Sequence, residues 1–269
     1  MTREIRISKR LQAIADLVSP DLVVADIGTD HALLPIFLIL EGKTPAAIAM
    51  DVKEGPLSRA RLGIEAAGLT DQITTRLSDG FAALSPGEAR SAVIAGMGGD
   101  LMIRILTEGM RLARTMEELI LAPQSHVAAV RAFVRAQGFA IDAEDMVYED
   151  GKYYPMFRVR AGAEPDDAST EDRIAGWKQS GVYKNVSGQE TVRAVPWDLL
   201  TLYDLYGELL LKQRHPVLRA YLLWERGVKE KILESLTKSG AQADIRRAQV
   251  AADLAKNAEA LIMMGAIIP

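Results

Sequence analysis

Hydrophobic and polar positions alternate up to residue 162 in a pattern of short apolar runs and amphipathic stretches. Runs rich in apolar or β-branched residues predict strands, at 22–27, 46–51, 73–77, 92–95 and 119–121. Between them, apolar residues recur at helical spacing, which predicts helices at 5–18, 33–40, 56–67, 101–112 and 127–137. Two later runs, 139–147 and 153–159, flank a Glu-Asp-Gly-Lys turn and predict a strand pair. Strands alternating with helices and followed by such a pair indicate an α/β fold, a doubly wound sheet with an antiparallel edge.

The pattern changes after Gly162. Residues 163–200 are polar and acidic at first, and we expect a linker or surface insertion with little regular structure. Helical spacing returns in the last part of the chain and is interrupted at Ser239-Gly240, which predicts an antiparallel, coiled-coil-like helical hairpin. The sequence thus predicts a domain at 1–162, a linker at 163–200 and a hairpin domain at 201–269.

The composition limits the class of protein to which this chain can belong and the kinds of site that it can carry. Its 269 residues are 49% hydrophobic, enough for a full core, and include no cysteine, which excludes disulfides and thiolate metal sites and favours a cytoplasmic protein. The start of the chain does not resemble a signal peptide, and no apolar run approaches the roughly 20 residues of a membrane span. The three histidines are scattered, so we expect no metal site. A net charge of −4 weighs against nucleic acid, although a local basic face can outweigh it.

Acidic residues and glycines follow four of the predicted strands. The carboxyl ends of the strands of a doubly wound sheet line one crevice, so these residues are expected to meet there. In chain order they are Asp26-x-Gly28-Thr29-Asp30, Asp51, Asp79-Gly80 and Gly96-x-Gly98-Gly99. Gly28 permits a sharp turn and a close backbone approach. The alternative is that each aspartate merely caps the helix that follows it.

The residue types indicate which ligand this crevice would take. The carboxylate of Asp26 argues against a diphosphate and suits a cationic or hydroxyl-rich ligand such as S-adenosylmethionine. The glycine fingerprint of NAD enzymes fails after Gly28, and the phosphate loop of ATP enzymes is absent. Asp51 is placed to accept from ribose hydroxyls. Asp79 could accept from an exocyclic adenine amine, with Gly80 leaving room for the ring.

Several motifs together resemble the bacterial tRNA adenine-N1 methyltransferases that modify adenine 22. They are Ser8-Lys9-Arg10-Leu11, Asp26-Ile27-Gly28-Thr29-Asp30-His31-Ala32-x-Leu34-Pro35, Ala49-x-Asp51-Val52-x-x-Gly55-Pro56, Ile94-Ala95-Gly96-Met97-Gly98-Gly99, Tyr206-Gly207-x-x-Leu210-Leu211, Pro216 and Tyr221-Leu222-x-x-Glu225. The segment Leu121-Ala122-Pro123-Gln124 matches the Leu-Gln-Pro-Asn of that family only loosely.

The resemblance implies a class I methyltransferase fold, S-adenosylmethionine as methyl donor, tRNA as substrate and a coiled-coil-like C-terminal domain. Carried onto this chain, it places the donor at Asp26, Gly28, Thr29, Asp30, His31, Asp51, Asp79, Gly80, Gly96 and Met97. We expect substrate contacts from Arg6, Lys9, Arg10 and Gly98.

The chemistry of the strand ends agrees with this resemblance. Enzymes that methylate an exocyclic adenine amine commonly carry an Asn or Asp and an aromatic residue after the fourth strand, where this chain has Ala95-Gly96-Met97-Gly98-Gly99. Ring N1 has a free lone pair and needs no deprotonation. Orienting this lone pair toward the methyl group can therefore provide much of the rate enhancement. Asp26 or Asp30 could stabilise the cation that forms.

Basic residues suggest where RNA would bind. The N-terminal helix carries Arg3, Arg6, Lys9 and Arg10, and the hairpin carries Lys229, Lys231, Lys238, Arg246 and Arg247. The hairpin is also rich in acids, so it could instead serve as a dimerisation element or lid. Two other functions stay open: a small-molecule or protein methyltransferase with the same donor site, and a non-catalytic RNA-binding adaptor. The sequence does not fix the oligomeric state.

Overall fold

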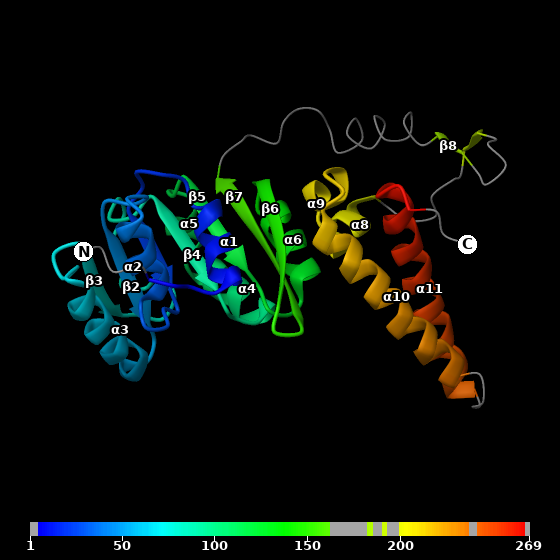
Figure 1. Cartoon of the computed structure of the whole chain (residues 1–269), viewed down its shortest axis with the longest axis horizontal. Coiled ribbons are helices and arrows are strands. Elements are labelled where there is room, and N and C mark those ends of the chain that lie inside the picture. Colours follow the sequence, from blue (N-terminus) through cyan, green and yellow to red (C-terminus); the bar gives the residue numbers. More distant parts are fainter. Residues whose placement is uncertain (1–4, 162–181, 185–189, 193–198, 237–240, 267–269) are drawn as a thin grey trace. The chain divides into compact units, whose positions relative to one another are not determined.

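The computed structural model describes residues 5–161, 182–184, 190–192, 199–236 and 241–266, and it divides the chain into two compact units, 1–165 and 166–269. The first unit is built on a seven-stranded sheet of order β3-β2-β1-β4-β5-β7-β6 (Figure 1). Its strands are β1 (Val24–Ile27), β2 (Ala47–Asp51), β3 (Ile73–Leu77), β4 (Ser91–Ala95), β5 (Glu118–Ala122), β6 (Phe139–Glu149) and β7 (Lys152–Ala161). β1 to β5 pair in parallel, and β7 pairs antiparallel with both β5 and β6. The predicted doubly wound sheet with an antiparallel edge is confirmed.

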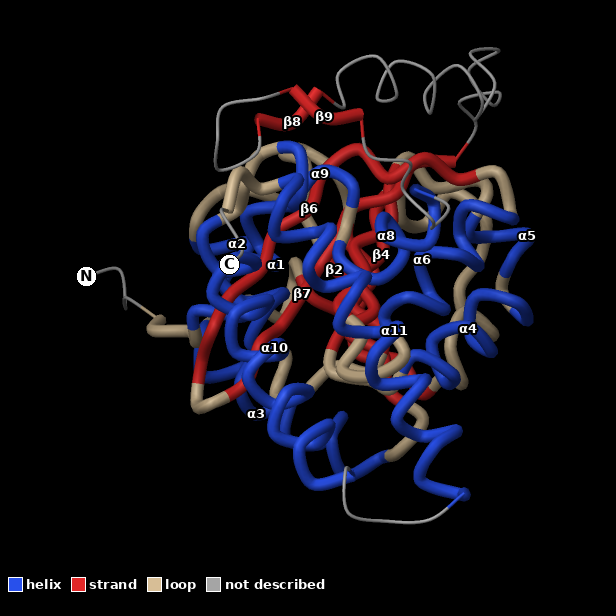
Figure 2. Tube along the Cα trace, turned by 90° about the vertical axis from the view of Figure 1, so that its right-hand side faces the viewer, coloured by secondary structure: helices blue, strands red, loops and turns tan. Residues whose placement is uncertain are grey.

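Helices cover both faces of this sheet (Figure 2). They are α1 (Lys9–Leu17), α2 (Leu33–Leu40), α3 (Glu54–Ala67), α4 (Gly99–Glu108), α5 (Met110–Ala113) and α6 (Val127–Ala136). Successive strand residues face opposite ways: Val24 packs toward α1 and α2, whereas its neighbour Ala25 packs toward α4 and α6. The central strands are therefore buried on both sides, which explains their unbroken apolar runs.

Two helix predictions were wrong in detail. The first helix begins at Lys9 and not at residue 5, because Ser8 is extended and its side chain accepts a hydrogen bond from Leu11 N, forming an N-cap. The helix predicted at 101–112 is two helices that meet at Gly109. A Cβ at that position would lie 2.2 Å from the Phe81 ring, so close packing against this ring accompanies the break.

The second unit contains two short paired strands and four helices within its described residues. The strands, β8 (Val182–Lys184) and β9 (Glu190–Val192), lie in the segment 163–200, where little structure was predicted; most of that segment lies outside the described residues. The helices are α8 (Leu199–Tyr206), α9 (Glu208–Lys212), α10 (Pro216–Leu236) and α11 (Ala241–Met263).

Helices α10 and α11 pack against each other around a largely buried carboxylate, that of Glu225. Tyr206 Oη and Tyr221 Oη donate to it at 2.9 and 3.2 Å, and Asn257 Nδ2 donates to it at 2.9 Å. Burial and the nearby carboxylate raise the pKa of both tyrosines, so both stay protonated donors. The C-terminal motif residues thus join α8, α10 and α11. None of the helices in the described ranges is long and apolar enough to cross a membrane.

Candidate active site

A cleft of about 630 Å³ lies at the carboxyl ends of β1, β2 and β4, beside α1. This volume falls in the ordinary range for ligand pockets. The structure brings six of the predicted donor-site residues into its lining: Asp26, Gly28, Asp30, Asp51, Gly96 and Met97. Two of the predicted substrate-side cations, Arg6 and Arg10, form part of the same wall.

Asp26 is the most unusual group in this cleft. It is the penultimate residue of β1, with only 7% of its surface exposed, and no Lys or Arg within the described part of the chain pairs with it. Burial raises the pKa of Asp26 to about 6, and the negative charges of Asp51 and Asp30 add to that effect, while the Thr29 side chain opposes it. A buried carboxylate without a cation is costly, and a cationic ligand in the cleft would relieve that cost.

Gly28 follows Asp26 and forms the floor of the cleft. Its φ of +81° is a conformation that glycine adopts without strain, and a Cβ there would lie 2.1 Å from Met97 Cε. The backbone N–H groups of Gly28 and Thr29 both donate to Met50 O at 2.8 Å, which ties this turn to the end of β2. Thr29 is buried beneath the turn and does not line the cleft.

Asp51 both closes the turn that leads into α3 and faces the cleft. Its Oδ1 accepts from Lys53 N at 2.7 Å, at the start of α3. Lys53 is the N-cap residue of α3 and no side chain caps this helix, so the capping interpretation does not hold for Asp51. Its second carboxylate oxygen is available to a ligand.

Asp30 and His31 stand at the outer rim. Asp30 lines the cleft, whereas His31 does not. His31 has a φ of +56°, and its Nε2 accepts from Arg59 Nε at 3.2 Å. Arg59 Nη2 also lies 3.8 Å from Asp30 Oδ1, so α3 helps to hold this loop.

Asp79 and Gly80 lie apart from this cleft. Asp79 borders a second hollow of about 390 Å³, and both of its oxygens accept from Arg104 of α4, at 3.0 and 3.3 Å. Gly80 is buried against Ile105. A role for Asp79 toward an adenine amine stays a prediction, and it would require this carboxylate to share or exchange Arg104.

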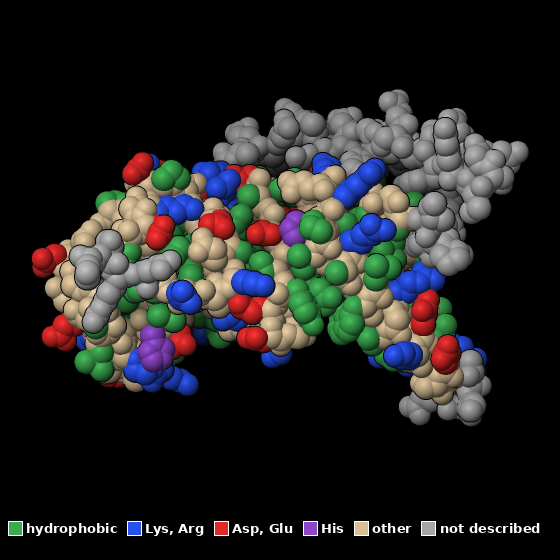
Figure 3. All heavy atoms as spheres, in the orientation of Figure 1, with side chains coloured by type: hydrophobic (Ala, Val, Ile, Leu, Met, Phe, Trp, Pro, Cys, Tyr) green, Lys and Arg blue, Asp and Glu red, His purple; other side chains and the backbone are tan. Residues whose placement is uncertain are grey.

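Some of the residues predicted to contact RNA line the cleft, and others do not. Arg6 precedes α1 and Arg10 lies in its first turn, with its guanidinium 4.9 Å from the centre of the Tyr154 ring. Lys9 does not line the cleft, although its backbone N–H donates to Glu149 Oε1 at 2.7 Å. Gly98 caps α4 outside the cleft, and Arg3 lies outside the described residues. On the face drawn in Figure 3, basic and acidic side chains are interspersed.

Gln124 lines the cleft just after β5, although the sequence analysis named it only within a segment that loosely matches the family and gave it no role. The signal was present, because Gln124 follows the predicted strand at 119–121 as the acids follow theirs.

Comparison with known proteins agrees with this geometry. Residues 7–157 match the family model described as a methyltransferase domain. The tRNA (adenine(22)-N(1))-methyltransferase of Bacillus subtilis (strain 168) is 38% identical over 159 residues, which cover 59% of this chain and 67% of that protein. The chain therefore belongs to the methyltransferase-domain family and, within it, to the tRNA (adenine(22)-N(1))-methyltransferases.

Solved structures extend the likeness over nearly the whole chain. The B. subtilis m1A22 tRNA methyltransferase TrmK is similar with a TM-score of 0.75 and 30% identity, covering 96% of this chain and all of that one. Streptococcus pneumoniae Sp1610 in complex with S-adenosyl-L-methionine is similar with a TM-score of 0.73 and 31% identity, covering 95% of this chain and all of that one.

Proposed function

We propose that this protein is an S-adenosylmethionine-dependent methyltransferase that methylates N1 of an adenine in tRNA. The observation that carries the donor assignment is the buried, unpaired carboxylate of Asp26 at the carboxyl edge of the sheet. The family to which the chain belongs supports the acceptor assignment. We place its action in the cytoplasm, with the tRNA it would modify.

The residues of the cleft fit this donor. Asp26 would hold a positively charged part of it. The Met97 methyl group fills the space that a side chain at Gly28 would need, so this glycine lets Met97 form part of the cleft wall. The free oxygen of Asp51 would accept from a ribose hydroxyl. When bound, S-adenosylmethionine supplies a methyl group attached to a positively charged sulfur.

Methylation of adenine N1 does not require the protein to remove a proton from the base. Adenine N1 attacks with a lone pair that is already free, so no general base is needed to create the nucleophile. The main task of the site is to orient the base toward the methyl group. Such orientation can lower the activation barrier by about 7–11 kcal/mol in favourable cases. Asp30 would face the positive charge that develops on the base, because it lines the cleft at its rim. A paired adenine would have to leave its stack to reach this site.

Arg6 and Arg10 are the best-placed cations for the tRNA backbone, because they line the cleft itself. Replacing both by Ala should weaken tRNA binding and flatten its log–log salt dependence by about 0.7–0.9 for each phosphate that is no longer neutralised. Arg90→Ala is the matched control, since Arg90 lies at the amino edge and pairs with Glu117. Binding and salt slope equal to wild type in the double variant would assign tRNA binding to another surface, with the hairpin next in line.

The function is tested by incubating the protein with labelled S-adenosylmethionine and bulk bacterial tRNA, then mapping the methylated nucleoside. Label in 1-methyladenosine supports the proposal. Label only in a small molecule or a protein would assign the enzyme to another substrate class. No transfer, with tRNA binding retained, would make it an RNA-binding adaptor.

A further inference from the structure

Gln124 is fixed in place by the backbone on either side of it. Its N–H donates to Met97 O at 2.8 Å, and the next residue, Ser125, accepts from Gly99 N through its carbonyl oxygen at 3.0 Å. The turn after β4 and the turn after β5 are thus bonded to each other. The side chain of Gln124 is exposed, lines the cleft and makes no hydrogen bond with the residues that the structure describes.

The sheet order puts Gln124 on the far side of the cleft from the donor carboxylates. β4 separates β5 from β1, and β2 lies beyond β1. Gly96, with a φ of +77°, lies between: a Cβ at that position would lie 3.9 Å from Gln124 Nε2. The carboxamide therefore stands beside the turn at the end of β4, opposite Asp26 and Asp51.

The reaction itself restricts how the base can be recognised. Adenine N1 must keep its lone pair for the methyl group, so N1 cannot serve as a hydrogen-bond acceptor for recognition. The edge that remains offers the N6 amine as donor and N7 as acceptor. A glutamine carboxamide matches that edge with two hydrogen bonds. Guanine presents two acceptors there, O6 and N7, and would leave the amide oxygen facing O6.

The other polar side chains of the cleft do not have this pair of groups. Asp26, Asp30 and Asp51 only accept when ionised, and Arg6 and Arg10 only donate. The Ser8 hydroxyl is engaged in capping α1. Within the described part of the cleft wall, Gln124 alone offers a donor and an acceptor in a fork.

We propose that Gln124 selects adenine by accepting from N6 and donating to N7, which leaves N1 free for methylation. This inference rests on the proposed function. Methylation at N1 makes the base cationic and its N6–H groups stronger donors, so the bond to Oε1 strengthens as the reaction proceeds. Gln124 should therefore affect kcat as well as KM.

The test measures two proteins, wild type and one variant, on two RNA substrates that differ in one atom of the base. The substrate is tRNA carrying adenosine or 7-deazaadenosine at the methylated position; the deaza base keeps N1 and N6 but cannot accept at N7. The variant is Gln124→Glu, whose carboxylate accepts from N6 but cannot donate to N7. We expect the deaza base to lower kcat/KM about tenfold for wild type. For Gln124→Glu we expect little further loss from the deaza base, because the bond to N7 is already gone.

Two controls separate recognition from disruption of the site. Gln124→Glu should bind S-adenosylmethionine as wild type does, measured by calorimetry. Gln72→Glu makes the same chemical change on an exposed residue just before β3, at the other edge of the sheet, and should leave all of these values unchanged.

The outcomes distinguish this inference from the proposed function. If wild type does not methylate adenine N1 in tRNA, the proposed function fails and the inference falls with it. If wild type methylates tRNA but the deaza base costs both proteins the same factor, only the role of Gln124 is overturned. Wild-type kcat/KM on adenosine for Gln124→Glu would also overturn it.

Discussion

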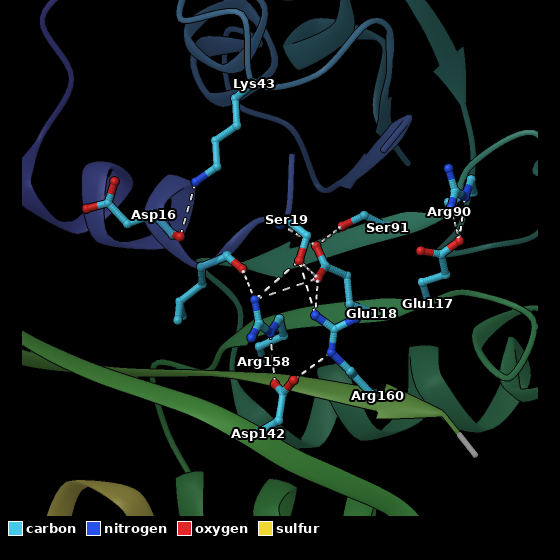
Figure 4. Close-up of polar contacts among 11 residues, drawn as sticks. Asp16, Ser19, Lys43, Arg90, Ser91, Glu117, Glu118, Asp142, Arg158 and Arg160 are labelled. Carbon is cyan, nitrogen blue, oxygen red and sulfur yellow. Dashed lines mark hydrogen bonds and ion pairs between the residues drawn. The ribbon is translucent and has the colours of Figure 1, made fainter. Parts of the chain in front are cut away.

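Two buried carboxylates at opposite edges of one sheet, those of Glu118 and Asp26, have opposite surroundings. Glu118 begins β5 at the amino edge and is fully buried, yet both of its oxygens have partners (Figure 4). Ser19 N and Oγ donate to it at 2.8 and 2.6 Å, and Ser91 Oγ donates at 3.1 Å. Arg160 and Arg158 lie 3.5 and 3.9 Å away. Asp26 lies one residue before the end of β1, at the carboxyl edge, and has no cation among the described residues.

The difference separates a structural acid from one held ready for a ligand. Glu118 joins the segment after α1 to β4, β5 and β7, so its charge is balanced within the fold. Asp26 is left with a pKa of about 6 because burial is not balanced by a partner. The unpaired buried carboxylate of Asp26 lies at the edge of the sheet where the cleft opens. Acids with a strongly shifted pKa in a cleft are typical of functional sites.

Removing the structural acid should produce the largest effect. Glu118→Ala leaves three donors without their acceptor, Ser19 N, Ser19 Oγ and Ser91 Oγ, while Arg158 and Arg160 keep Asp142. Because each buried donor left unpaired costs about 1–3 kcal/mol, we expect the free energy of unfolding to fall by about 3–5 kcal/mol. Chemical denaturation measures this. The donor affinity of the folded fraction should stay near wild type. A loss below about 1 kcal/mol would mean that water replaces Glu118 without difficulty.

Removing the charge of Asp26, the acid of the cleft, should raise the free energy of unfolding, whereas removing Glu118 should lower it. Because about 1.4 kcal/mol corresponds to each pKa unit, the rise from 3.8 to about 6 destabilises the folded chain by roughly 3 kcal/mol above pH 6. Asp26→Asn should recover part of that at pH 7.5 in denaturation experiments. It should also weaken S-adenosylmethionine binding about ten- to hundredfold, because a charged partner is removed. Lower stability together with unchanged affinity would place Asp26 in the same class as Glu118.

At Asp51 we expect an effect on donor binding alone, because one of its oxygens accepts from Lys53 N in the turn before α3 and the other is free. Asp51→Ala should weaken donor binding roughly ten- to hundredfold, measured by calorimetry. Asp51→Asn keeps an acceptor for Lys53 N and should separate the role of Asp51 in the turn from its role in binding. Wild-type affinity in Asp51→Ala would refute the ribose contact.

The sequence predicted those features that depend on nearby residues. The strands and the turn at Gly28 follow from unbroken apolar runs that end at acids and glycines. The meeting of Asp26, Asp30 and Asp51 follows from the rule that parallel strands end at one edge. Their positions could therefore be predicted without a structure.

Features that depend on distant residues could not be predicted in this way. The break at Gly109 accompanies packing against Phe81, and the pairing of Asp79 with Arg104 depends on where α4 lies. The position of Gln124 needs the hydrogen bond from its N–H to Met97 O. Glu118 looks like any acid at the start of a strand until Ser19, Arg158 and Arg160 are brought to it by the fold.

The pH dependence of donor binding tests the contrast between the two acids most directly. A cationic donor binds the ionised form of Asp26, which predominates above pH 6 and is lost as pH falls through that value. Calorimetry with S-adenosylmethionine between pH 5 and 7 should show wild-type affinity falling as the pH drops, approaching tenfold per unit below 6. The Asp26→Asn variant should show weak binding without this dependence. A flat profile for wild type, or an equal slope in the variant, would contradict the account.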